Sequence, residues 1–207
     1  MRITGKELER GSSKGINSLS YSIVRVAARS VLAPFFAYRV EGRENVPWKS
    51  SFILLPKHQR WQDIPLLGLA SPTPLYYVAK KELFMNRLSN WFMTSLGGIP
   101  MDRRRPLTSR NSIKTVVGLL KGKAGVVVFP EGTYYKGAMG SGYVGLIRLI
   151  RARVDVPFIP TGIRYSGEGM RKLVEVKFGN ALHWESSTEP EVFLAAAMQQ
   201  IRVLSGL

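Results

Sequence analysis

The chain has 207 residues, of which 45% are hydrophobic and 21% are charged, so it can bury one sizeable core and is not a disordered chain. It contains no cysteine, which excludes disulfides, thiolate nucleophiles and cysteine-based metal sites. With 30 Lys and Arg against 14 Asp and Glu, the net charge of +16 favours nucleic acid, anionic lipid headgroups or phosphorylated substrates as partners.

The first part of the chain predicts an amphipathic helix. The opening MRITGKELER carries charges where a signal peptide would have its apolar run. Over residues 16–36 apolar side chains recur at three-to-four spacing, and Arg25 and Arg29 share another face, so we expect a helix that ends near Pro34. The two arginines interrupt the roughly 20 apolar residues that a membrane span needs. Such a helix packs either on the core or on a membrane surface. We predict one domain, formed by residues 38–207, which is preceded by an amphipathic, membrane-associating helical segment at residues 1–37.

The rest of the chain alternates short apolar runs with helical patterns. One helix is predicted to end at the Gly97-Gly98 pair, a second to cover residues 107–121 and a third to cover residues 189–205. This alternation is typical of a single α/β domain, in which a mostly buried mixed sheet is flanked by helices and ligands collect beyond the carboxyl ends of the strands. The predicted strands are 51–56, 74–80, 98–102, 124–130, 156–163 and 173–179.

The segment KHQRWQDIP places one of the two histidines, His58, five residues before Asp63 and directly after a predicted strand. A tight turn there would bring the carboxylate onto one imidazole nitrogen, fix the tautomer and leave the other nitrogen to act as a general base. A purely structural pair has the same spacing. A metal site is disfavoured, because His183 lies far along the chain and cysteine is absent.

The sequence FPEGT, residues 129–133, follows another predicted strand. Gly132 permits a tight turn, and exposed backbone N–H groups together with the Thr133 hydroxyl could form an anion-binding nest. Glu131 adds a carboxylate that could bind a substrate hydroxyl or a cation. An ordinary surface turn is the alternative.

The sequence GGIPMDRRR, residues 97–105, ends a third strand in three consecutive arginines. Arginine recognises phosphate through two parallel hydrogen bonds, so this strand end could form a basic mouth together with Lys80 and Lys81. A solvated charged face is the alternative interpretation.

Taken together, these motifs resemble the four ordered blocks of the glycerolipid acyltransferases, and most of all the 1-acylglycerol-3-phosphate acyltransferases. The resemblance spans roughly residues 16–165. It rests on His58-x4-Asp63, on GIPMDR at 98–103, on FPEGT at 129–133 and on VPFIP at 156–160.

The resemblance implies a glycerol-3-phosphate acyltransferase-like fold and a direct acyl transfer to a lysophospholipid hydroxyl. The donor would be acyl-CoA or acyl-carrier protein as co-substrate, with no other cofactor and no metal. His58, oriented by Asp63, would be the general base. The acceptor would most simply be 1-acyl-sn-glycerol-3-phosphate, which gives phosphatidic acid. The phosphate-bearing acceptor would be held by Lys80, Arg103, Glu131, Gly132 and Thr133.

The resemblance also implies that residues 156–160 shape the acyl pocket or the floor of the sheet. Because acceptor and product are lipids, we expect peripheral or monotopic attachment to the cytoplasmic face of the membrane and no nucleic-acid partner. Two departures bear on the acceptor. Lys57 replaces the usual Asn or Ser before the histidine, and Tyr134-Tyr135 replace the usual Arg-Ser.

Two other classes of function stay open. The charge of +16 would suit a nucleic-acid-binding module, but the sequence shows no motif of that class. A catalytically silent lipid-binding relative would share the same four blocks, although the intact His58 and Asp63 argue against it.

Overall fold

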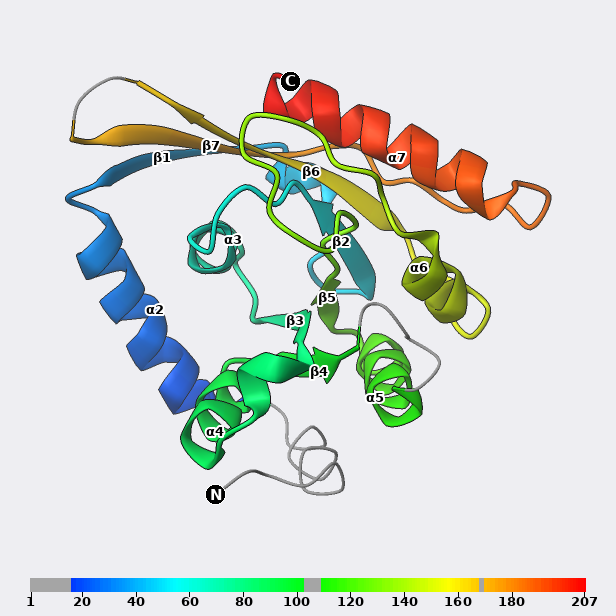
Figure 1. The fold of residues 1–207 in the computed structure, drawn as a ribbon, viewed down its shortest axis with the longest axis horizontal. Coiled ribbons are helices and arrows are strands. Elements are labelled where there is room, and N and C mark those ends of the chain that lie inside the picture. Colours follow the sequence, from blue (N-terminus) through cyan, green and yellow to red (C-terminus); the bar gives the residue numbers. More distant parts are fainter. Residues whose placement is uncertain (1–15, 103–108, 168–169) are drawn as a thin grey trace.

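The computed structural model describes residues 16–102, 109–167 and 170–207, and Figure 1 shows one twisted sheet with helices packed on both of its faces. The strand order is β1-β7-β6-β2-β5-β3-β4. Neighbouring strands are parallel except β6 and β7, so the predicted mixed sheet is confirmed. The strands are β1 (Phe36–Glu41), β2 (Phe52–Pro56), β3 (Leu75–Lys80), β4 (Gly98–Met101), β5 (Gly125–Val127), β6 (Phe158–Ser166) and β7 (Lys172–Phe178).

The helices form two groups, one on each face of the sheet (Figure 1). Helices α2 and α3 pack on one face, and α5, α6 and α7 pack on the other, while α4 lies beside the β4 edge. Two short 3₁₀ helices, η1 and η2, complete the fold. The bounds are α2 (Ser18–Leu32), η1 (Arg43–Asn45), α3 (Asp63–Ala70), η2 (Lys81–Phe84), α4 (Arg87–Ser95), α5 (Arg110–Lys121), α6 (Val144–Arg151) and α7 (Pro190–Ser205).

Strand β2 shows why the central strands could be recognised from the sequence. All five of its residues are buried, because a strand inside a parallel sheet is covered on both faces and so has a continuous apolar sequence. Phe52 and Leu54 join the core beneath α2 and α3, whereas Ile53 and Leu55 join the core beneath α5, α6 and α7. Strands β5 and β6 flank β2, so the chain just after Pro56 emerges at the middle of the sheet's carboxyl edge.

Three elements differ from the prediction. Strand β1 was not predicted, because this edge strand, which begins at Phe36, has no fully buried residue; the first helix itself ends at Leu32, close to the expected end near Pro34. Helix α6 was not predicted, because its eight residues give too short a periodic pattern. Strand β5 is confined to Gly125–Val127, since the chain then leaves the sheet for the FPEGT turn.

The remaining predicted elements are confirmed within a few residues at each end. Helix α4 ends at Ser95, just before the predicted glycine pair, and Gly97 has a φ of 84°. An added Cβ at that position would lie 2.9 Å from the Leu75 carbonyl oxygen, which explains the requirement for glycine. Helix α7 begins with Pro190 in its first turn, as expected.

Candidate active site

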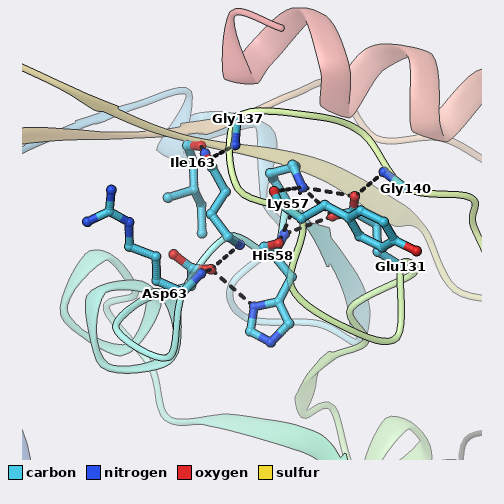
Figure 2. Close-up of polar contacts among 10 residues, drawn as sticks. Lys57, His58, Asp63, Glu131, Gly137, Gly140 and Ile163 are labelled. Atoms are coloured by element: carbon cyan, nitrogen blue, oxygen red, sulfur yellow. Dashed lines mark hydrogen bonds and ion pairs between the residues drawn. The ribbon is translucent and has the colours of Figure 1, made fainter.

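His58 and Asp63 meet at the carboxyl edge of the sheet. His58 lies two residues beyond the end of β2, and Asp63 is the first residue of α3, so the turn between them folds the carboxylate back toward the ring. The distance from His58 Nδ1 to Asp63 Oδ2 is 3.1 Å (Figure 2). His58 is 4% exposed and Asp63 is fully buried. The contact expected from the sequence spacing is therefore formed.

The Asp63 carboxylate is held as a hydrogen-bond acceptor. Its Oδ2 also accepts hydrogen bonds from the backbone N–H of Gln59 at 2.6 Å and from that of Arg60 at 2.8 Å. Donors of this kind favour the ionised form of a carboxyl group. In this arrangement the Nδ1–H of His58 donates a hydrogen bond to the Asp63 carboxylate, which places the basic lone pair of the neutral imidazole on Nε2.

Two aromatic rings fix the plane of the imidazole. The Phe129 ring stacks on His58 with 3.8 Å between the ring centroids and 26° between the planes. The Tyr134 ring lies 4.3 Å from the His58 ring at a tilt of 52°. Phe129 is buried, whereas Tyr134 is 52% exposed and forms part of the rim beside the histidine. The tyrosine that replaces the usual arginine thus contacts the candidate general base directly.

Lys57 and Glu131 form a fully buried ion pair beside His58 (Figure 2). The distances from Lys57 Nζ are 2.7 Å to Glu131 Oε2, 2.9 Å to Glu131 Oε1 and 2.8 Å to the Tyr135 carbonyl oxygen. Neither side chain of the pair has any exposed surface. The unusual lysine of the first block is therefore paired with the carboxylate of the FPEGT turn and does not point into solvent.

Comparison with known proteins identifies the family of this chain. A family model described as Acyltransferase matches residues 37–164, which is more than half of the chain. The chain belongs to the acyltransferase family. Its sequence is 32% identical over 171 residues to a 1-acyl-sn-glycerol-3-phosphate acyltransferase of Bacillus subtilis, covering 79% of this chain and 82% of the relative. The predictions of an acyltransferase enzyme and of its fold are thereby confirmed.

Two further comparisons extend the likeness. A 1-acyl-sn-glycerol-3-phosphate acyltransferase of Streptococcus pneumoniae is 30% identical over 135 residues, which cover 64% of this chain and 50% of the relative. The crystal structure of a 1-acyl-sn-glycerophosphate acyltransferase from Thermotoga maritima superposes with a TM-score of 0.67 over 97% of this chain and 87% of that one. At 23% sequence identity, that structure supports the fold of this acyltransferase.

The predicted residues of the FPEGT turn take different positions in this acyltransferase. Both Glu131 oxygens accept hydrogen bonds from protein groups, which include the N–H of His58 at 3.0 Å and that of Gly140 at 2.7 Å. This burial favours a structural role for Glu131 over the expected contact with the acceptor. Gly132 forms the predicted turn with a φ of 67°, and its N–H donates to the Phe129 carbonyl at 3.2 Å. The Thr133 side chain is exposed.

The predicted basic mouth is described only in part. Lys80 ends β3 and is 66% exposed, with its Nζ 4.0 Å from Glu82 Oε2. In the β3–β4 register Lys80 stands opposite Met101, so it lies beside the strand end that leads toward Arg103. Arg103 itself lies outside the described residues. The Lys81 Nζ contacts Asp102 Oδ2 at 2.8 Å. Within the described ranges, no three His, Asp or Glu side chains gather as a possible metal-ligand set.

Sequence reasoning missed two side chains that support the site. Gln59 donates from Nε2 to the Ile163 carbonyl at 2.7 Å and accepts from the Gly137 N–H at 3.0 Å (Figure 2). Tyr165 donates its hydroxyl hydrogen to Asp63 Oδ1 at 2.6 Å. Tyr165 stands 102 residues beyond Asp63, and no spacing in the sequence indicates the contact. The neighbouring block at 156–160, expected to shape the acyl pocket or the sheet floor, runs into β6 in the middle of the sheet.

Proposed function

We propose that this acyltransferase moves an acyl chain from acyl-CoA or acyl-carrier protein to the free hydroxyl of a lysophospholipid. The acceptor is 1-acyl-sn-glycerol-3-phosphate and the product is phosphatidic acid. The observation that carries this proposal is the 3.1 Å contact between His58 Nδ1 and Asp63 Oδ2 at the carboxyl edge of the sheet. The names of the Bacillus subtilis and Streptococcus pneumoniae relatives support the choice of acceptor.

The reaction needs no nucleophile from the protein. His58 Nε2 takes the proton from the acceptor hydroxyl as its oxygen attacks the carbonyl carbon of the thioester. The resulting tetrahedral intermediate collapses with cleavage of the C–S bond, and the imidazolium returns the proton to the departing sulfur. The products are a carboxylic ester and a free thiol. Asp63 stabilises the imidazolium that exists between the two proton transfers.

The phosphate of the acceptor is expected at the basic mouth formed by Lys80 and Arg103. Lys80 supports this assignment, because its side chain is exposed at the carboxyl end of β3. The exposed Thr133 and the Gly132 turn would face the same edge of the sheet. Tyr134 stands where the family resemblance implies arginine, so an aromatic ring with a hydroxyl group would replace one phosphate-binding fork.

The enzyme is proposed to act while attached to the membrane surface. Across the described ranges, every helix is too short or too polar to traverse a bilayer. Helix α2 nevertheless exposes Leu19, Ile23 and Val26, whose spacing places them on one face. Helix α4 exposes Leu88 at 75% and Trp91 at 61%. Apolar side chains at this exposure, combined with a charge of +16, favour peripheral attachment to an anionic leaflet, which we place on the cytoplasmic side.

The deciding experiment measures thiol release from palmitoyl-CoA and from palmitoyl-acyl-carrier protein in the presence of lysolipids. The chain has no cysteine, so a thiol reagent reports only the released product. We expect release that depends on 1-acyl-sn-glycerol-3-phosphate and phosphatidic acid in equal amount. The His58→Ala variant should lose activity, whereas His183→Ala, which changes an exposed histidine, should keep it.

Other outcomes would contradict the proposal in distinguishable ways. Thiol release only with a phosphate-free or zwitterionic lysolipid would support acyl transfer and would identify a different acceptor. Lysolipid binding without thiol release from either donor would indicate a silent lipid-binding protein. Salt-sensitive binding to nucleic acid without any lipid activity would indicate the third class, because such binding weakens steeply as salt displaces phosphate contacts.

A further inference from the structure

The Asp63 carboxylate is bound at both of its oxygens by different parts of the fold. Oδ2 faces the turn that carries His58 and accepts three hydrogen bonds there. Among the residues that the structure describes, Oδ1 accepts one hydrogen bond, from the hydroxyl of Tyr165 at 2.6 Å. Tyr165 lies near the end of β6, so the strand beside β2 reaches over the sheet edge to the far side of the carboxylate.

Tyr165 is itself held in place as a donor. The guanidinium carbon of Arg60 lies 4.5 Å from the centroid of the Tyr165 ring, and the Phe36 ring packs edge-on at 6.1 Å. Burial, followed by the negative charge of Asp63 and the hydrogen bond to it, raises the pKa of the Tyr165 hydroxyl far above its usual range. The hydroxyl therefore keeps its proton at any working pH.

We propose that Tyr165 is a positioning residue that sets the orientation of Asp63 and, through it, the basicity of His58. The hydrogen bond to Oδ1 fixes the carboxylate plane so that Oδ2 points at Nδ1. It also draws part of the carboxylate charge away from the imidazole. The catalytic part of this inference rests on the proposed function, whereas the effect on His58 titration does not.

The other charged or titratable groups near the pair cannot substitute for this hydroxyl. Lys57 and Glu131 form an ion pair, and the Glu131 carboxylate accepts a hydrogen bond from the backbone N–H of His58, not from its ring. Arg60 contacts Asp63 through its backbone N–H and places its guanidinium over the ring of Tyr165. Tyr134 contacts the His58 ring from the rim of the site. Tyr165 is thus the donor that acts on the Oδ1 side of Asp63.

Removal of the hydroxyl has a predictable sign. In Tyr165→Phe the carboxylate loses a donor, so more of its negative charge acts on His58 and the imidazolium is favoured. The His58 titration midpoint should rise by roughly half a pH unit, the size expected from one hydrogen bond acting through a second group. Replacing Tyr165 with 3-fluorotyrosine keeps the shape and strengthens the donor, so the midpoint should then fall.

Histidine NMR measures this effect directly, because the chain contains only two histidines. The exposed His183 serves as an internal reference in every titration. The matched control is Tyr77→Phe, which removes a buried hydroxyl that donates to the carbonyl of Ile64, the residue after Asp63, at 3.3 Å and that does not bond the Asp63 carboxylate. A His58 midpoint that stays at the parent value in both Tyr165 replacements would overturn the inference.

Kinetics provide the second measurement. In Tyr165→Phe we expect kcat to fall about tenfold with KM unchanged, in line with one hydrogen bond to a charged group. The acid limb of the pH profile should move to higher pH together with the NMR midpoint, and Tyr77→Phe should change neither.

If the parent enzyme proves inactive with every acceptor while the NMR shifts occur, the proposed function fails and the positioning role stands. A fall in kcat without any change in pH profile or NMR midpoint would reduce Tyr165 to a packing residue.

Discussion

Lys57 Nζ lies 2.7 Å from Glu131 Oε2, and both side chains are completely buried. Removal of one partner leaves an unpaired charge in the core, so Lys57→Met should lower the free energy of unfolding by about 3–5 kcal/mol. The Lys57→Met/Glu131→Leu double variant should recover much of this loss, because no unpaired charge remains. Chemical denaturation checks both values.

The control for this prediction is Lys177→Met, which breaks partly exposed contacts with Glu41 at 3.3 Å and Glu175 at 3.7 Å. Surface pairs of this kind contribute about 1 kcal/mol or less. Equal decreases in the free energy of unfolding of the Lys57 and Lys177 variants would show that the buried pair stabilises the fold no more than a surface pair does.

The charge of Asp63 should matter strongly to catalysis. Asp63→Asn retains the size of the side chain and removes the charge that stabilises the His58 imidazolium, so kcat/KM should fall at least about a hundredfold. Asp155→Asn changes an exposed carboxylate and should have no effect. Steady-state thiol release measures both, and near-parental activity in Asp63→Asn would refute the general-base mechanism.

The basic mouth should appear mainly in KM. A charged contact made equally in the ground and transition states changes substrate affinity more than turnover. Lys80→Ala and Arg103→Ala should each raise the KM for 1-acyl-sn-glycerol-3-phosphate by about tenfold, a typical loss for a charge-assisted hydrogen bond. Lys121→Ala, in the last turn of α5, is the matched control.

Tyr134→Arg tests the same mouth from the opposite direction. Introducing the arginine that the family resemblance implies after FPEGT should lower the KM for the phosphate-bearing acceptor if that acceptor is the natural one. A rise in KM, or a stronger preference of the parent enzyme for a phosphate-free lysolipid, would show that the tyrosine has changed the specificity of the site.

Stability should decline in alkaline solution. Burial raises the pKa of Tyr77 well above its usual value, and burial with the Asp63 charge does the same for Tyr165. Above about pH 10 the unfolded chain loses these protons while the folded chain keeps them, so the free energy of unfolding decreases as pH rises. Each such tyrosine contributes a slope of about 1.4 kcal/mol per pH unit. Denaturation between pH 9 and 11 should show a smaller slope for Tyr165→Phe and for Tyr77→Phe, and an unchanged slope in both would contradict this account.

Attachment to anionic liposomes should depend on the exposed apolar faces. The Leu19→Ser/Ile23→Ser/Val26→Ser variant of α2 and the Leu88→Ser/Trp91→Ser variant of α4 should each sediment less with anionic liposomes, since apolar burial contributes roughly 25 cal/mol per Å². Val192→Ser/Val203→Ser changes two exposed valines of α7 and is the control. If only the control reduces binding, the membrane faces α7 instead.

The sequence predicts the centre of this fold better than its edge. Strand β2 is covered on both faces, and its unbroken apolar run has few other interpretations. Strand β1 has one neighbour, so its residues are partly exposed and their pattern does not separate strand from helix. The contact between His58 and Asp63 follows from short-range geometry, because a strand end and a helix start separated by a tight turn leave the two side chains few other positions.

The contacts that complete the site are long-range and so escape sequence reasoning. Sequence alone predicts a solvated side chain for a lysine such as Lys57, because its buried partner, Glu131, lies 74 residues away. The same holds for Tyr165, which reaches Asp63 because β6 pairs beside β2. Local patterns therefore predict the two candidate catalytic side chains, whereas sheet topology determines what surrounds them.

The connection between β5 and α6 has a consequence for how the enzyme meets its substrates. Its amide groups at Tyr135, Gly137 and Gly140 donate to the His58 carbonyl, the Gln59 side chain and Glu131. These amides should exchange with deuterium as slowly as those of the central strands. Such slow exchange would place the segment in the same cooperative unit as the sheet, so that it would not open and close during turnover. An arriving lipid would meet a finished site, and the choice among acceptors would be made by the groups at its rim.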